Sequence, residues 1–502
     1  MKKIMILVAM LTCLFTVHTT SWAQPKGTLR VAVSTDLLGL DPLQAFTVSG
    51  LVMQRHIYDS LVSFGANGTI QPQLAVSWKL LDEKTWRFNL RKGIKFHNGY
   101  PFTAADVKFS IEYLLDPKNK WNFRTYFDSF DAIETIDDYT INIKTKIPDP
   151  VLPNNLAAFV NVISKKSYDE NGSEGLKNQA IGTGPFKFVS WRRNDRLVLE
   201  ANNEWYASPP KVKTLMFRII PEMGARVAEL QAGGVHIIFD VPPFMVSQLK
   251  KGEDTDVLSV PSLRTIYMII DTLKIPQLKD RRVRQALNFG VDKEAIVKGI
   301  LNGMGTPLGT HVPLLVGGAD PSIKPYPYDP QKAKDLLKEA GYPNGFSLNL
   351  YSPNGRYLMD KEVTLAVADQ LSKVGIKTNV QVMESNTYLK ELSAHNLEGI
   401  YLIGIASRTY DVNYSLNQLN PNFVLCYYQD KELEEMVNKT KATMDSTKRY
   451  NSAYKIQKIV HDEAIFLPLY NEMGIYGVSK KVKGFEAPVD EMMQLWNVSV
   501  TE

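Results

Sequence analysis

Cysteine is scarce in this chain of 502 residues, which contains only Cys13 and Cys426. Cys13 lies in an apolar N-terminal segment that we expect to be removed, so the mature chain would keep a single cysteine. One cysteine cannot form an internal disulfide. Stability must therefore come from a large buried core, and a hydrophobic content of 44% in a chain of this length can supply one.

A strong charge imbalance is also missing. The chain has 58 Lys and Arg against 53 Asp and Glu, a net charge of +5. Two of those positive charges, Lys2 and Lys3, lie in the N-terminal segment that we expect to be removed. No block of like charge suggests a basic stripe or an acidic tail. We therefore predict no nucleic-acid partner.

Catalytic and metal-binding motifs are absent as well. The seven histidines are far apart, without the H-E-x-x-H or C-x-x-C spacing of metal ligands. The segment Gly182–Phe188 is rich in glycine, but it lacks the Lys-Ser/Thr of a phosphate-binding loop and favours a plain turn. We predict no catalytic residue, no metal ligand and no cofactor. An exported hydrolase stays open as the less favoured alternative, because distant residues can meet in space.

The N-terminal segment has the pattern of a cleavable signal peptide. Lys2 and Lys3 precede the apolar run Ile4–Phe15, and Ser21 and Ala23 place small residues before Gln24. This pattern predicts a signal over residues 1–23 with cleavage before Gln24. The run is too short to span a bilayer as a helix. Cys13 lies inside the run without the small residues of a lipoprotein signal, so we expect a soluble periplasmic protein.

Helix and strand patterns alternate along the rest of the chain. A capping box at Thr103–Asp106 predicts a helix start. Asp329 before Pro330 predicts another helix, ending at Gly341. The segment Trp86–Phe96 alternates like a hairpin with its turn at Lys92-Gly93, and Ile376–Glu384 reads as a strand. The alternation predicts an α/β fold, and the length predicts more than one lobe.

Several segments, in the same order, resemble the extracellular solute-binding proteins of family 5, the peptide, dipeptide and nickel receptors of ABC importers. The resemblance runs from about Thr28 to beyond Tyr470. It is carried by "QPQLAVSWKL", "TWRFNLRKGIKFHNGYPFTAADVKFSIEYL", "GTGPFKFVSWRRNDRLVLEANNEWY", "RRVRQALNFGVDKEAIV" and "YDPQKAKDLLKEAGYPNGFSL".

The resemblance implies an α/β, two-lobed periplasmic-binding-protein fold with an extra inserted domain and a two-strand hinge. The hinge strands would cross near Ile266–Asp271 and Gly474–Ser479. The implied units are lobe I in three pieces, residues 24–58, 181–270 and 481–502, the extra domain at 59–180, and lobe II at 271–480.

The resemblance also implies a binding protein and not an enzyme. Such a protein captures a small solute, peptide-like or carboxylate-bearing, by lobe closure and delivers it to permease subunits in the inner membrane. We expect a monomer. A nickel or metal-chelate receptor of the same family stays open as the alternative.

Arg408 departs from the family pattern. In peptide-binding members, the segment matching Ile403–Leu416 carries two aspartates, and the first pairs with the α-amino group of the ligand. A gapless alignment places Arg408 at the first aspartate and Asp411 at the second. A guanidinium suits a carboxylate or phosphate and repels an ammonium. Arg408 is therefore a candidate ligand contact, with pairing to Asp411 or exposure to solvent as the alternatives.

The other candidate ligand-binding residues come from segments that line the cleft in the family. For each of them, packing or an ordinary loop is the alternative role. They are Tyr410, Asp411, Asn413 and Tyr414 beside Arg408, Thr35, Asp36 and Leu38 after the first strand, and Tyr267 near the hinge.

Overall fold

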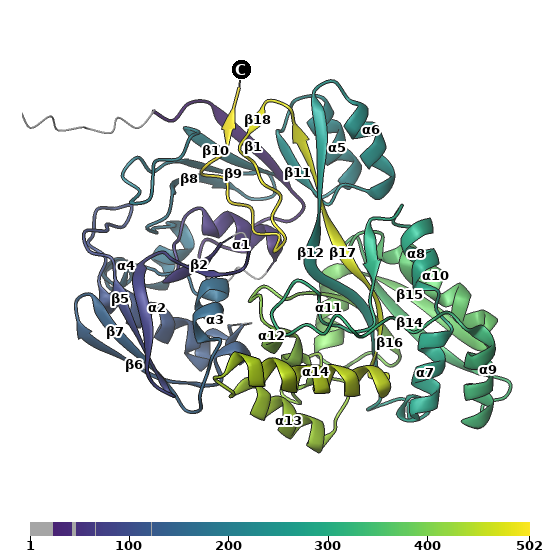
Figure 1. Cartoon of the computed structure of the whole chain (residues 1–502). Helices are drawn as coiled ribbons and strands as arrows, with labels where there is room; N and C mark the ends of the chain where they lie inside the picture. The colour runs from purple at the N-terminus through teal and green to yellow at the C-terminus, as the bar shows by residue number, and fades with distance from the viewer. Residues whose placement is uncertain (1–23, 43–46, 66, 122, 502) are drawn as a thin grey trace, which may run out of the picture.

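The computed structural model describes residues 24–42, 47–65, 67–121 and 123–501. The predicted signal peptide, residues 1–23, lies outside the described residues. Figure 1 shows two lobes of mixed helices and strands, joined by two long strands that run between them. Along the described chain, no helix combines the length and the apolar character needed to cross a membrane.

One sheet continues through both lobes. Among the described residues it has 11 strands in the order β15-β14-β16-β12-β17-β11-β1-β10-β9-β8, and β13 pairs with β17. The strands are β1 (Thr28–Val33), β8 (Phe186–Arg192), β9 (Arg196–Ala201), β10 (Thr214–Ile219), β11 (Ile237–Phe239), β12 (Thr255–Ile270), β13 (Gly305–Pro307), β14 (Phe346–Asn354), β15 (Ile376–Glu384), β16 (Ile400–Ala406) and β17 (Phe466–Ser479).

The two long strands, β12 and β17, connect the lobes. The first half of β12 pairs with the end of β17, which also pairs with β11 of the first lobe. The second half of β12 pairs with β16 of the second lobe. The register between β12 and β17 shifts between Pro261 and Thr265. The predicted hinge segment Ile266–Asp271 lies on β12 as far as Ile270, on the second-lobe side of this irregular step. Gly474–Ser479 lies on β17, on the first-lobe side.

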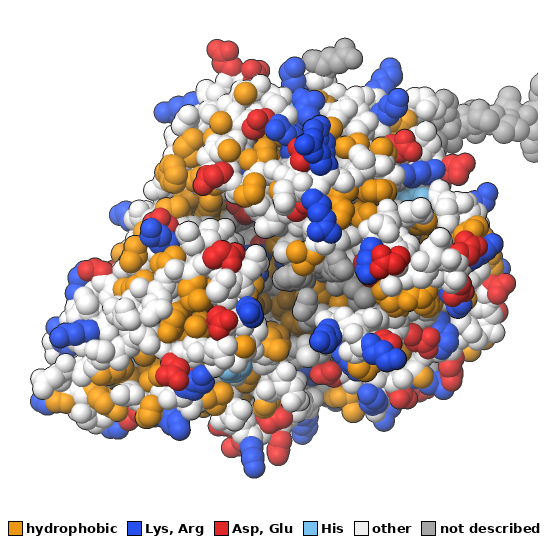
Figure 2. Space-filling view, turned by 180° about the vertical axis from the view of Figure 1, so that it is seen from behind, with side chains coloured by type: hydrophobic (Ala, Val, Ile, Leu, Met, Phe, Trp, Pro, Cys, Tyr) orange, Lys and Arg blue, Asp and Glu red, His pale blue; other side chains and the backbone are white. Residues whose placement is uncertain are grey.

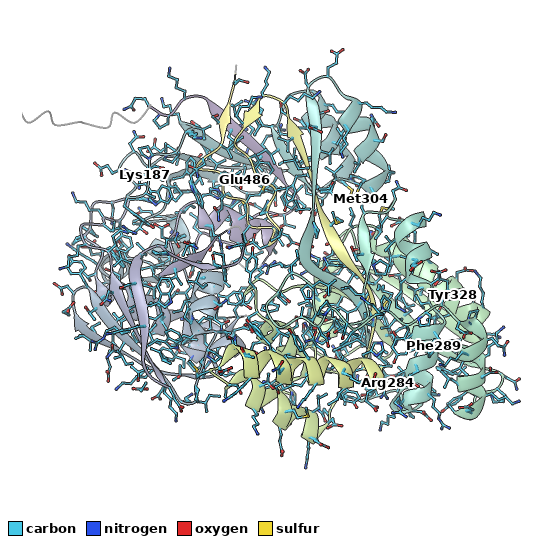
Figure 3. The ribbon with its side chains drawn as sticks, viewed as in Figure 1. Lys187, Arg284, Phe289, Met304, Tyr328 and Glu486 are labelled. Carbon is cyan, nitrogen blue, oxygen red and sulfur yellow. The ribbon has the colours of Figure 1, made fainter. Side chains whose placement is uncertain are left out.

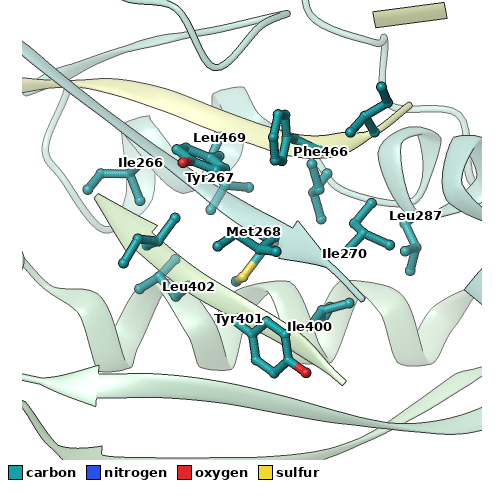
Figure 4. Packing of buried hydrophobic residues seen from close by; sticks show 14 of the residues in the cluster. Ile266, Tyr267, Met268, Ile270, Leu287, Ile400, Tyr401, Leu402, Phe466 and Leu469 are labelled. Atoms are coloured by element: carbon teal, nitrogen blue, oxygen red, sulfur yellow. The ribbon is translucent and has the colours of Figure 1, made fainter. Parts of the chain in front are cut away.

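The second lobe has its own hydrophobic core. Figure 4 shows part of it, where Tyr267 and Met268 of β12 pack against Leu402 of β16 and Phe466 of β17. Helices cover this part of the sheet (Figure 1). They are α7 (Arg281–Phe289), α8 (Lys293–Gly299), α9 (Pro330–Glu339), α10 (Asp360–Lys373), α11 (Ser385–Ser393), α12 (Val412–Leu416), α13 (Lys431–Lys441) and α14 (Ser446–Asp462).

The first lobe is built from segments that are far apart in the chain. Its main core joins β1, β9 and β10 to residues after β17, such as Met493 and Leu495. The helices on this side are α1 (Val48–Arg55), α4 (Lys165–Asn178), α5 (Met223–Gln231) and α6 (Val246–Lys251), and β18 (Val482–Lys483) pairs with β19 (Ser499–Val500).

A separate core lies within residues 61–162 and is closed by Tyr414 from the second lobe. Its sheet has the order β4-β5-β7-β6, next to the small pair β2–β3. The elements are β2 (Val62–Phe64), β3 (Ile70–Pro72), β4 (Ala75–Asp82), β5 (Thr85–Leu90), β6 (Phe130–Asp137), β7 (Thr140–Thr145), α2 (Ala104–Leu115) and α3 (Leu152–Phe159). The limits of the predicted extra domain, 59–180, and of the other units stay a prediction.

Candidate functional site

The segment after β16 forms a tight, well-anchored turn at the junction of the lobes. The backbone N–H of Ser407 donates to the carbonyl of Leu263 on β12 at 2.9 Å. Tyr410 has a positive φ of 55° and exchanges backbone contacts with Gly317, whose N–H donates to its carbonyl at 2.9 Å. A left-handed conformation is costly for a tyrosine and persists only where its surroundings hold it. The turn therefore presents its side chains in a fixed arrangement.

This turn makes the contacts between the lobes. Tyr414 stacks on Tyr126 with ring centroids 4.8 Å apart and an interplanar angle of 10°. Tyr410 packs on Phe64 at 4.9 Å. The side-chain amide of Asn154 donates to the carbonyl of Thr409 at 2.8 Å. Stacked aromatic pairs contribute about 0.5–1.5 kcal/mol each beyond their buried area. These contacts join the two lobes at this turn, and Figure 2, seen from behind, shows the hollow between the lobes.

Arg408 is enclosed at this junction with spare hydrogen-bond donors. Its side chain is 11% exposed, and its nearest carboxylate is that of Glu491, with Nη2 3.9 Å from Oε2. That distance is too long for a hydrogen bond. Its Nε is buried and has no hydrogen-bond partner among the described residues. A buried guanidinium that lacks acceptors is unfavourable, so this geometry suits an incoming anion.

The carboxylate beside Arg408 belongs to a second arginine. Arg264 on β12 donates from Nε and Nη2 to the two oxygens of Glu491, at 2.8 and 2.5 Å. Its Nη1 donates to the carbonyl of Gly404 at 3.1 Å. The carboxylate of Glu472 on β17 lies 3.2 Å from the same guanidinium. Glu491 is therefore already paired with Arg264, while its distance of 3.9 Å from Nη2 of Arg408 leaves Arg408 without a hydrogen bond to it.

Burial at this point raises the pKa values of two acids, and their acidic neighbours add to the shift. Burial raises the pKa of Glu472 to about 8, with repulsion from Glu491 and Asp240 adding to the effect and Arg264 opposing it. Burial also raises the pKa of Asp240 to about 6, although Arg226 opposes it. One of the two carboxyls facing Arg264 is therefore kept protonated near neutral pH, since a single guanidinium cannot balance both.

Asp411 does not pair with Arg408, so that alternative is wrong. Its Oδ2 accepts from Nη2 of Arg449 at 2.9 Å and from the hydroxyl of Tyr450 at 3.2 Å. Its Oδ1 accepts from the backbone of Asn413 and so begins α12. The side chains of Asp411 and Arg449 are 5% and 6% exposed. Because these bonds occupy the carboxylate, the prediction that Asp411 contacts the ligand has no geometric support.

The neighbours of Arg408 divide between the interface and the lobe interior. Tyr410 and Tyr414 face the first lobe, as their ring contacts show. Asn413 is buried, and its amide points to the carbonyl of Lys441 on α13 at 3.5 Å. Asn413 therefore lies inside the second lobe and away from the junction.

Tyr267 is a core residue. It is 1% exposed, packs against Phe466 at 5.1 Å and donates its hydroxyl to Gln418. Its position on a strand near the hinge did not show whether the side chain contacts a ligand or packs in the core. Since the ring is enclosed by its own lobe, the structure gives the candidate contact between Tyr267 and a ligand no geometric support and favours the alternative of packing.

The loop after β1 lies toward the outer edge of the first lobe. Asp36 accepts from the indole N–H of Trp191 at 2.9 Å and from the backbone N–H of Asn194 at 2.7 Å. Both partners belong to the β8–β9 hairpin, which is at the far end of the sheet from β17. Thr35 bonds weakly with Thr47 at 3.5 Å, and Leu38 is 55% exposed. The structure does not bring these three residues together with Arg408.

Three other residues at the junction were not predicted from the sequence, namely Arg55, Asp490 and Glu491. Arg55 at the end of α1 donates to the carbonyl of Ala157 at 3.0 Å. Its guanidinium also interacts electrostatically with Asp490 and Arg408. Tyr410 shares a hydrogen bond with Asp490. Glu491 has a positive φ of 66°. No local pattern links α1 or the C-terminal segment to Arg408, so only the tertiary structure reveals them.

The described residues line a cavity at this junction and another that lies away from it. One of about 190 Å³ lies beside Phe64, Tyr410 and Asp490. The other, of about 490 Å³, lies entirely within residues 91–206. In the part of the chain that the structure describes, no group of three or more His, Cys, Asp or Glu side chains is arranged to hold a metal ion.

Comparison with known proteins now identifies the family. The model of the bacterial extracellular solute-binding proteins, family 5 Middle, matches residues 69–423. The chain belongs to this family. Among curated relatives, a glutathione-binding protein GsiB from Pectobacterium atrosepticum is 28% identical over 488 residues, covering 94% of each chain. Heme-binding protein A from Haemophilus influenzae is 30% identical, covering 86% of this chain and 84% of its own.

The solved structures agree with this assignment. The ABC transporter-associated periplasmic binding protein DppA from Helicobacter pylori, in complex with the peptide STSA, superposes with a TM-score of 0.85. It is 27% identical, and the match covers 95% of this chain and 98% of that one. The predicted two-lobed α/β fold of a family 5 solute-binding protein is thereby confirmed.

Proposed function

We propose that this family 5 protein is the periplasmic receptor of an ABC importer, which captures a small carboxylate-bearing solute by closing its lobes. It then delivers the solute, as a monomer, to permease subunits in the inner membrane. Family membership supports solute binding. The charged, apolar and small-residue pattern of residues 1–23 supports export by a cleaved signal.

The observation that carries the ligand class is the state of Arg408. Its guanidinium is enclosed at the lobe junction, its Nε lacks a partner among the described residues, and the nearest carboxylate is 3.9 Å away and bound to Arg264. A guanidinium offers a planar fork of donors that fits a carboxylate or a phosphate. The site therefore favours an anionic group and disfavours an α-ammonium at this position.

The ligands named for related proteins fit this chemistry. Glutathione, heme and the peptide STSA each carry at least one carboxylate, and they are bound by the relatives described above. We infer a carboxylate-bearing solute of that general kind for this chain. The family consists of binding proteins, and we infer that this member likewise leaves its solute unaltered.

The proposal is tested by thermal shift with a defined panel. Glutathione, the peptide STSA and dicarboxylates are compared with their amidated counterparts, which keep size and shape but lose the negative charge. A receptor is stabilised by RT ln(1 + [L]/Kd), so a carboxylate ligand should raise Tm and its amide should not. Small-angle scattering should show a more compact particle with the same ligand. Equal shifts with acid and amide would contradict the ligand class, and chemical conversion of the ligand would contradict a receptor.

The exported state is tested separately by mass spectrometry of protein from the cell envelope. We expect Gln24 as the first residue and no acyl chain. An acylated Cys13 would contradict a soluble periplasmic protein.

A further inference from the structure

A cavity of about 490 Å³ lies outside the lobe junction. One wall is the segment Arg91–His97 that follows β5, and the other walls come from residues 183–187 and 202–206 of the first lobe. Figure 3 labels Lys187 on the first lobe, well away from the crossing strands β12 and β17. No residue of the second lobe lines this cavity. It is therefore distinct from the site around Arg408, and its volume lies in the range of small-molecule pockets.

The lining of this cavity is strongly basic. Four cationic residues line it, Arg91, Lys92, Lys95 and Lys187, against the single acidic residue Glu204. Within the described residues, none of these five side chains has an oppositely charged partner within 4.0 Å. Like charges gathered in a concave surface create a positive potential that attracts and concentrates anions.

The positions of two of these cations are fixed by aromatic rings. The guanidinium of Arg91 lies 4.8 Å from the ring centroid of Tyr206, and its Nε donates to the carbonyl of Gln73 at 3.2 Å. The ammonium of Lys92 lies 5.4 Å from the ring centroid of Tyr139. Cation–π contacts orient these groups without neutralising their charge, so the terminal donors of Arg91 stay available.

The remaining polar groups of the cavity do not compensate for the charge. His97 uses both ring nitrogens, bonding the carbonyl of Gly184 at 3.0 Å and accepting from the N–H of Gly182 at 3.4 Å. Burial lowers the pKa of His97 to about 4, and Lys187 contributes to the shift. Behind the lining residues Thr183 and Trp205, the carboxylate of Asp59 accepts hydrogen bonds from both of them and from Gln73. The carboxylate of Asp59 is thus already hydrogen-bonded and does not compensate for the cations.

We propose that this cavity is a second binding site, for a phosphate-bearing anion with more than one negative charge. Three lysine ammoniums supply point charges and Arg91 supplies a fork, the combination that suits phosphate oxygens. The group is either a free phosphorylated solute or the headgroup of an anionic phospholipid. The site does not depend on the solute that binds at Arg408.

The soluble source is tested with inorganic pyrophosphate on the full mature chain, by calorimetry at low salt. The variant Lys95→Gln/Lys187→Gln removes two cations from the cavity. Its matched control, Lys250→Gln/Lys377→Gln, removes two exposed lysines elsewhere. Charge-assisted hydrogen bonds predict an affinity loss of about tenfold or more in the first variant. The control should bind as the native protein does, and both variants should keep the native Tm.

The lipid source is tested by co-sedimentation with vesicles of phosphatidylglycerol, with vesicles of phosphatidylcholine as the neutral reference. Binding that depends on Lys95 and Lys187 in either arm supports the site and identifies its source. If neither pyrophosphate nor the anionic vesicles bind, or if the control variant loses as much affinity as the cavity variant, the proposal is overturned.

Discussion

Arg264 and Arg408 both lie near the carboxylate of Glu491, yet their surroundings differ. Arg264 holds Glu491 through two short hydrogen bonds and binds the carbonyl of Gly404. Arg408 lies 3.9 Å from Glu491, and its Nε has no partner among the described residues. Arg264 is thus a structural residue of the hinge, whereas Arg408 has side-chain donors that no described residue accepts from. An enclosed arginine is thus informative about ligands only when its donors are counted.

Loss of Arg264 should have the largest effect on stability. Arg264→Ala leaves Glu491 and Glu472 buried without their guanidinium, and breaking a buried ion pair in this way costs about 3–5 kcal/mol. Urea denaturation of the ligand-free protein measures the loss. Arg192→Ala is the matched control, because that side chain is 78% exposed and 3.5 Å from Asp195. Equal stability of the two variants would contradict a structural role for Arg264.

Blocking lobe closure should weaken ligand binding with a smaller cost. A Cβ on Gly68 would lie 2.2 Å from Cδ1 of Tyr410, so Gly68→Ala forces that ring to move. Overpacking of this kind costs about 1–3 kcal/mol, which predicts a loss of roughly tenfold in affinity. Gly93→Ala is the control, since Gly93 has a similar φ of +76° and no atom within 4 Å of its Cβ position. If both variants bind alike, contacts at Tyr410 do not govern closure.

The stability of the hinge cluster should depend on pH. Burial raises the pKa of Glu472 from 4.5 to about 8, so the folded protein holds a proton that the unfolded chain releases. The contribution is therefore fully present below pH 4.5 and is lost as the pH rises toward 8. The slope is at most about 1.4 kcal/mol per pH unit. Denaturation of the native protein and of Glu472→Gln at pH 5 and pH 8 should show a smaller fall in the variant. Parallel pH profiles would contradict the raised pKa.

Local sequence signals predicted many elements of the fold. The Thr103 capping box begins α2, Asp329 caps α9 at Pro330, and Ile376–Glu384 is β15. Each of these signals acts within a few residues. The hairpin predicted at Trp86–Phe96 is wrong, because β5 ends at Leu90 and pairs instead with β4 and β7. Alternation identified a strand there but could not identify its partners.

The partners of the candidate site residues could not be predicted either, because they are distant in the sequence. Position in the family pattern drew attention to Arg408, but the partner of Asp411 is Arg449 on α14, and the neighbour of Arg408 is Glu491 near the C-terminus. No local sequence pattern predicts either pairing, because the partners are far apart in the chain. Asp36 and Arg408 each follow a strand in the sequence. Only the structure shows that Asp36 bonds to the β8–β9 hairpin while Arg408 lies at the lobe junction.

The most direct test of the account measures Arg408→Ala in two ways, by the affinity for the carboxylate ligand that the panel identifies and by the unfolding free energy without ligand. A bidentate, charge-assisted bond contributes about 1.5–3 kcal/mol. Affinity should therefore fall roughly ten- to a hundredfold, and Arg408→Lys should recover only part because an ammonium lacks the fork. The ligand-free stability should hardly change. Unchanged affinity with a clear loss of stability would contradict the account and make Arg408 a structural residue like Arg264.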